Sequence, residues 1–109
     1  LRKRPDKGLL AGMWELPGVE VGEGDLPGEA ATRLARALGL DLLEGARELE
    51  PLVHSFSHLR VRYHPHLFPV LRGLPVPGTL WTSWEGVREL PLPVAQRRML
   101  EAAWGVLQG

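Results

Sequence analysis

The spacing of apolar residues predicts a helix in the first half of the chain. Ala30, Leu34 and Leu38 recur at intervals of four residues, which is typical of the buried stripe of a helix. Pro27 precedes this stripe and favours the first helical turn, while Gly39 follows it at a position where helices commonly end. We therefore expect a helix that begins near Pro27 and stops at Gly39.

A second apolar stripe predicts a helix at the end of the chain. Pro93 favours its start. The stripe has helical spacing and comprises Ala95, Met99, Leu100, Ala103, Trp104 and Leu107.

Between the two helices, alternating residues predict strands. Glu50–Phe56 and Leu59–His64 have strand character, and Ser57-His58 between them is expected to form the turn of a hairpin. Leu67–Leu71 is expected to continue the second strand beyond Pro65, which marks a bulge or a sheet edge.

Three shorter strands complete the expected fold. Met13–Leu16 and Thr79–Trp84 are short apolar or aromatic strands, and residues 1–4 resemble the end of a strand whose beginning is missing. This order predicts an α+β fold, an α/β/α sandwich in which two helices flank a small mixed sheet. Residues 1–109 suit a single domain, which we expect to be a fragment of a longer polypeptide with its first strand clipped.

Composition narrows the class of protein. Hydrophobic residues make up 44% of the chain and charged residues 24%, which is typical of a globular domain and argues against disorder. The chain has no cysteine, which excludes disulfides, thiol catalysis and cysteine-ligated metal clusters within it. No apolar run approaches the roughly 20 residues of a membrane span, so we expect a cytoplasmic protein with no membrane partner.

Charge is unevenly distributed along a chain whose net charge is zero, which argues against a globally basic nucleic-acid binder. Residues 51–84 contain Arg60, Arg62, Arg72 and all four histidines, but no Asp or Glu. This segment suits either a surface that binds an anion or a set of buried strands. Within it, basic and apolar residues alternate from Leu59 to His64, which predicts a half-buried strand with one cationic face.

The run from Gly18 to Leu40 resembles the sequence box of the Nudix hydrolases, which implies a Nudix-like fold. The first glycine, an apolar position and the closing Gly-Leu pair match, at Gly18, Leu34 and Gly39-Leu40. The acidic positions of the box do not match. Mg²⁺ is held by carboxylates, and this helix offers Glu29 alone. We expect a Nudix scaffold without hydrolytic chemistry. The positions that differ are Gly24, Thr32, Arg33, Arg36 and Ala37.

Three further stretches resemble the C-terminal domain of the adenine DNA glycosylases of the MutY family. Lys7–Gly18 (KGLLAGMWELPG) is similar to its GLLAGLWEFPG signature, and His54–Leu59 (HSFSHL) is similar to its Phe-Ser-His loop. Leu90–Leu100 resembles the start of its last helix and the loop before it.

The resemblance implies a function in base excision repair. Members of this family remove adenine mispaired with 8-oxoguanine, using an N-terminal domain that holds the catalytic acids and an iron–sulfur cluster. The C-terminal domain clamps the duplex and recognises the oxidised base. For this chain we therefore expect lesion recognition, no catalytic residue and no cofactor of its own. The expected partners are double-stranded DNA containing 8-oxoguanine:adenine and the glycosylase domain of the same polypeptide, in the cytoplasm and associated with the nucleoid.

The chemistry of 8-oxoguanine suggests roles for the loop. Oxidation at C8 turns N7 from an acceptor into an N–H donor and adds an acceptor at O8. We expect the Ser57 hydroxyl to accept from N7–H if its own proton is committed elsewhere. Phe56 would wedge or stack beside the base, and His58 would brace the loop or meet a phosphate. Arg60 and Arg62 would contact phosphates.

Other interpretations remain open. The chain could be a free-standing Nudix-type nucleotide hydrolase or nucleotide-binding module, or a module that docks to protein. His64 and His66 would share a strand face and could bind zinc, although no carboxylate or cysteine completes a ligand set. Four tryptophans could form a platform for bases, but we favour core packing for each. They are Trp14, Trp81, Trp84 and Trp104.

Overall fold

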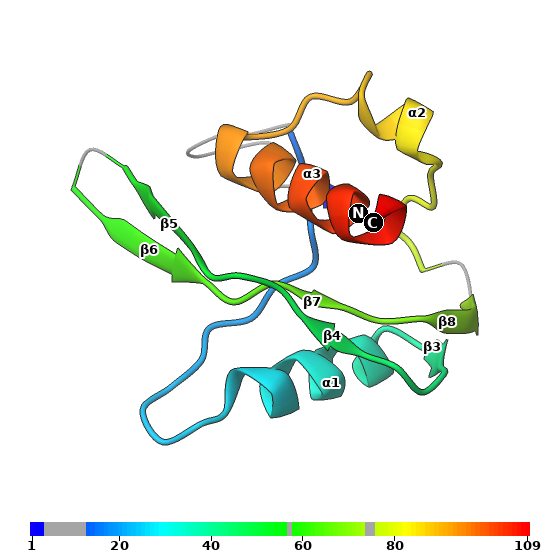
Figure 1. Ribbon diagram of the computed structural model, residues 1–109, viewed down its shortest axis with the longest axis horizontal. Coiled ribbons are helices and arrows are strands. Elements are labelled where there is room, and N and C mark those ends of the chain that lie inside the picture. Colours follow the sequence, from blue (N-terminus) through cyan, green and yellow to red (C-terminus); the bar gives the residue numbers. More distant parts are fainter. Residues whose placement is uncertain (4–12, 57, 74–75) are drawn as a thin grey trace. The chain divides into compact units, whose positions relative to one another are not determined.

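The computed structural model describes residues 1–3, 13–56, 58–73 and 76–109, whose contacts divide the chain into two compact units (Figure 1). One unit comprises Leu1–Pro17 with Pro75–Gly109, and the other is Gly18–Leu74. Helices and strands occur in both, which confirms the predicted α+β class. The Lys7–Gly12 part of the first glycosylase-like motif lies outside the described residues. The expectation of a single domain over residues 1–109 stays a prediction.

The unit Gly18–Leu74 consists of one helix and a long antiparallel path of strands. Its elements are α1 (Pro27–Ala37), β3 (Leu40–Leu42), β4 (Arg47–Glu48), β5 (Leu52–Ser55), β6 (Arg60–Tyr63), β7 (His66–Leu67) and β8 (Val70–Gly73). Strands β3, β4 and β5 form the outgoing part of the path, and β6, β7 and β8 return beside them, so that β5 pairs with β6, β4 with β7 and β3 with β8. The sequence predicted one small mixed sheet, whereas the strands of the described residues form separate two-stranded antiparallel ladders.

Prolines separate the pieces of the returning path. Pro65 lies between β6 and β7, and Pro69 lies between β7 and β8. A proline cannot donate a ladder hydrogen bond, but its carbonyl can still accept one. The Leu49 N–H donates to the Pro65 oxygen at 3.0 Å, and the Leu43 N–H donates to the Pro69 oxygen at 2.9 Å. The two sides of the path therefore stay joined between the ladders.

Helix α1 begins and ends where its sequence predicts. Pro27 occupies the first turn, and Leu26 before it is extended. Gly39 follows the helix with φ of +78°, a left-handed conformation that glycine adopts without steric cost. The helix buries Ala30 and Ala35 and packs against β3.

The second unit is built around the C-terminal helix. It contains β1 (Arg2–Lys3), β2 (Trp14–Glu15), α2 (Trp84–Val87) and α3 (Val94–Gln108). Strands β1 and β2 pair antiparallel, and Arg2 Nε lies 3.0 Å from Glu15 Oε1. Buried apolar side chains among the described residues of this unit include Val87, Leu92, Ala95 and Met99.

Two hydrogen bonds attach the segment of β2 to distant parts of this unit. The Leu16 N–H donates to Oε1 of buried Gln96 at 3.0 Å, and the Trp14 N–H donates to the Pro91 oxygen at 2.9 Å. The Leu1 nitrogen donates to the Leu80 oxygen at 3.1 Å.

The strand predicted over Thr79–Trp84 is wrong. Thr79 forms a single bridge with Arg2, and the chain then turns into helix α2. Ser83 caps this helix because its Oγ accepts from the Gly86 N–H at 3.2 Å. Serine is a strong helix-start residue, so local capping prevails over the aromatic strand pattern.

Tryptophan packing is also only partly as expected. The rings of Trp84 and Trp104 stack with centroids 5.1 Å apart, and both are half-buried. Trp14 is half-buried as well. Trp81 is 59% exposed, so the prediction of core packing is wrong for this residue.

Candidate nucleic-acid interface

The β5–β6 hairpin carries most of the residues that the sequence selected. The Phe56 N–H donates to the Leu59 oxygen at 2.6 Å, and the Leu59 N–H donates to the Phe56 oxygen at 3.4 Å. The predicted pairing of the two strands in a hairpin is confirmed, whereas Ser57 of the expected turn lies outside the described residues. In Figure 1 the hairpin extends outward from the β4–β7 ladder of the same unit.

One face of the hairpin is cationic. Alternation along β6 places Arg60 and Arg62 on the exposed face, while Val61 and Tyr63 point to the half-buried face. Within the part of the chain that the structure describes, neither arginine forms an ion pair with a carboxylate. The cationic face that the alternating pattern predicted along this strand is therefore present.

The other face holds Phe56 in place. Its ring is half-buried and forms a T-shaped pair with the His54 ring, with centroids 4.7 Å apart and planes at 73°. Such an edge-to-face contact is favourable because the positive ring edge meets the negative ring face. Sequence reasoning missed this pair, although residues two apart in a strand always share a face.

The structure places four of the five predicted interface residues. Phe56 and exposed His58 flank the tip, and Arg60 and Arg62 follow on the cationic face. Ser57 lies outside the described residues. The roles assigned to these five residues stay predictions.

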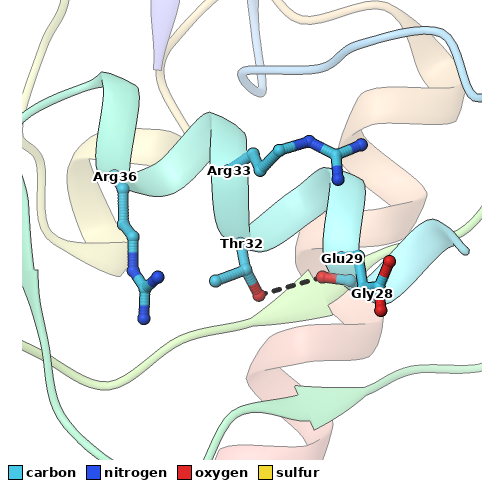
Figure 2. A pocket seen from close by; sticks show the side chains of 5 residues that line it. All are labelled: Gly28, Glu29, Thr32, Arg33 and Arg36. Atoms are coloured by element: carbon cyan, nitrogen blue, oxygen red, sulfur yellow. Dashed lines mark hydrogen bonds between the residues drawn. The ribbon is translucent and has the colours of Figure 1, made fainter.

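A second polar surface lies on helix α1. Figure 2 shows a depression lined by Glu29, Thr32 and Arg36, together with Gly28 and Arg33. The Thr32 hydroxyl donates to the Gly28 carbonyl at 2.9 Å, as the dashed line shows. Glu29 supplies the only carboxylate among these five side chains, and a single carboxylate beside two guanidinium groups does not suit a divalent cation.

The rings of His54 and His66 make local contacts. Nδ1 of His66 lies 2.8 Å from the His64 carbonyl oxygen, so it carries the proton and donates there. His54 contacts Phe56 as described above. Among the residues that the structure describes, no three histidine or acidic side chains are grouped so that they could hold a metal ion. In the same residues, no helix has the length and apolar character that a membrane crossing needs.

Comparison with known proteins agrees with the fold and with the resemblance in the sequence. The chain is 29% identical over 119 aligned residues to the adenine DNA glycosylase of Homo sapiens, which covers 100% of this chain and 21% of that protein. The enzyme of the same name from Rattus norvegicus is 28% identical, with 91% and 20% covered. That from Arabidopsis thaliana is 35% identical, with 64% and 13% covered.

The chain thus spans about a fifth of the length of the mammalian relatives that it matches. A family model described as a NUDIX domain matches residues 1–102, which is nearly the whole chain. This match identifies the family. The chain belongs to the NUDIX domain family.

Proposed function

We propose that this chain is the non-catalytic lesion-recognition domain of an adenine DNA glycosylase, and that it recognises 8-oxoguanine opposite mispaired adenine in base excision repair. The hairpin is the observation that carries this proposal. It holds the Phe56 ring directly after β5 and two exposed guanidinium groups on one face of β6. The similarity to adenine DNA glycosylases along the chain supports the same conclusion.

The dimensions of a hairpin suit a duplex. A two-stranded ribbon fits the major groove of DNA, where N7 and O6 of guanine are displayed. Arg60 and Arg62 would contact phosphates, which position the protein without selecting a sequence. His58 is exposed beside the tip and would brace the loop or meet a further phosphate.

Selection of the oxidised base would rest on the tip itself. Ser57 would accept a hydrogen bond from N7–H, which undamaged guanine lacks in the duplex. Phe56 would stack beside the base, with His54 fixing the orientation of its ring. The damaged base and the adenine opposite it would both be held in double-stranded DNA while another domain of the same polypeptide excises the adenine.

The substitution Ser57→Ala tests the assignment in the full polypeptide that contains this sequence. We expect the preference for 8-oxoguanine:adenine over guanine:adenine duplexes to fall by about 1–3 kcal/mol, since the variant cannot form one base-specific hydrogen bond. Titration of both duplexes measures this preference. Ser55→Ala is the matched control, because Ser55 is exposed and belongs to the β5 strand, where it pairs with Arg60, rather than to the connection.

An unchanged preference in Ser57→Ala contradicts the role of the serine.

The family match also favours a second candidate, a Nudix-type nucleotide hydrolase. Incubation with 8-oxo-dGTP and Mg²⁺ distinguishes the two. Because the α1 depression offers only Glu29, we expect no release of phosphate or pyrophosphate, and release would support the hydrolase instead.

A further inference from the structure

An exposed leucine adjoins the tip of the hairpin. Leu59 is 62% exposed and immediately follows the two linking residues. Single exposed apolar side chains are common on protein surfaces, so exposure alone carries no function. The position of Leu59 relative to Phe56 and the cationic face is what distinguishes it.

Leu59 shares a face with Phe56. The two residues exchange both backbone hydrogen bonds, so they lie directly opposite each other across the hairpin. Directly opposed residues of an antiparallel pair point to the same face. Alternation places His54 and Val61 on this face as well. The tip therefore has an apolar face in which Phe56 is half-buried against His54 and Leu59 remains open to solvent.

The two faces of the hairpin suit the two parts of a nucleic-acid duplex. Arg60 and Arg62 on one face are complementary to phosphates. The apolar face at the tip is complementary to bases, since leucine and phenylalanine are among the side chains that insert between base steps and partly unstack them. Because the cationic face lies on the same hairpin, charge complementarity favours DNA as the occupant of the apolar face.

We propose that Leu59 inserts against a base step beside the lesion, with Phe56 and His54 supporting it from the same face. The inference rests on the proposed function of the hairpin and adds a contact residue to it. Leu59 supplies apolar area and helps to open the stack, whereas recognition of the oxidised base belongs to Ser57.

Leu59→Ala and Leu71→Ala form a matched pair for the test. Leu71 lies on β8 of the same unit and is 63% exposed, so the two substitutions remove equal side chains from equally exposed positions. The full polypeptide is titrated with a duplex that contains 8-oxoguanine:adenine and a 2-aminopurine next to the lesion. Fluorescence of 2-aminopurine rises when the base is unstacked, which a purely structural role of the leucine would not change.

We expect Leu59→Ala to abolish most of the rise in fluorescence that the unmodified protein produces, and to weaken binding about tenfold, because less apolar area is buried against the bases. The dependence of binding on salt should stay the same, because no phosphate contact is removed. Leu71→Ala should behave as the unmodified protein does. Thermal unfolding should be equal in the two variants.

Equal fluorescence and equal affinity in Leu59→Ala and Leu71→Ala overturn the proposal. If Leu59→Ala loses the fluorescence rise and the affinity while the unmodified protein shows no preference for 8-oxoguanine, the Leu59 contact stands and the proposed lesion specificity fails. If the unmodified protein does not bind duplex DNA, the Leu59 contact and the proposed function are both overturned.

Discussion

The left-handed backbone at Gly39 ends helix α1 and sets the direction of β3. Its φ of +78° is costly for any residue with a Cβ, although no atom lies within 4 Å of where that Cβ would be. The cost of Gly39→Ala is therefore almost entirely conformational. We expect a loss of about 1–2 kcal/mol in the free energy of unfolding, measured by urea denaturation.

Gly105→Ala is the control for this prediction. Gly105 also has open space around its Cβ position, but it lies inside helix α3 and has no positive φ. Alanine is a better helix former than glycine there, so we expect a gain of about 0.5–1 kcal/mol. A loss at both glycines would contradict the conformational explanation.

Individual side chains were predictable where alternation is strict. The exposure of Arg60 and Arg62 follows from a period of two in β6. The exposure of Trp81 could not be predicted in this way. Trp81 lies in irregular backbone between a bridge at Thr79 and the capped helix α2, where no periodicity constrains the side chain.

At the scale of elements, long periodic segments were predictable and short ones were not. Helices α1 and α3 and the β5–β6 hairpin occur where the pattern indicates. The strand expected over Leu67–Leu71 is instead two strands, because Pro69 has no N–H to continue the ladder. Strand β4 has only two residues, too few to show any period.

Helix α3 holds the segment of β2 through one buried side chain. Gln96 accepts the Leu16 N–H at 3.0 Å across 80 residues of sequence. Gln96→Ala leaves this donor without its partner, and we expect a loss of about 1–3 kcal/mol in the free energy of unfolding. Thermal or urea unfolding measures it.

Gln108→Ala provides the comparison on the same helix. Gln108 is exposed at the end of α3, so its substitution should leave the free energy of unfolding almost unchanged. Equal small effects at both glutamines would show that the Gln96 hydrogen bond contributes little.

The whole molecule is neutral, and its charges are segregated. The hairpin arginines lie in a segment without carboxylates, whereas residues 8–50 are rich in acids. Binding to duplex should therefore depend on few phosphate contacts. We expect the double substitution Arg60→Gln with Arg62→Gln to reduce the slope of log K against log salt by about 2, since each arginine would neutralise one phosphate.

Arg88→Gln with Arg98→Gln changes the net charge equally and serves as the control. Both arginines are exposed in the other unit of the chain, so we expect little change in the slope. A similar reduction in both double variants would indicate a diffuse effect of net charge rather than contacts of the hairpin.

The short connection between β5 and β6 constrains how this protein can vary. Because strand side chains repeat every two residues, adding or deleting a single residue within β5 or β6 would exchange the faces beyond that point. The guanidinium groups would then turn inward and the apolar groups outward. Substitutions at the hairpin can adjust its chemistry one residue at a time, but a change in its length would invert that chemistry all at once.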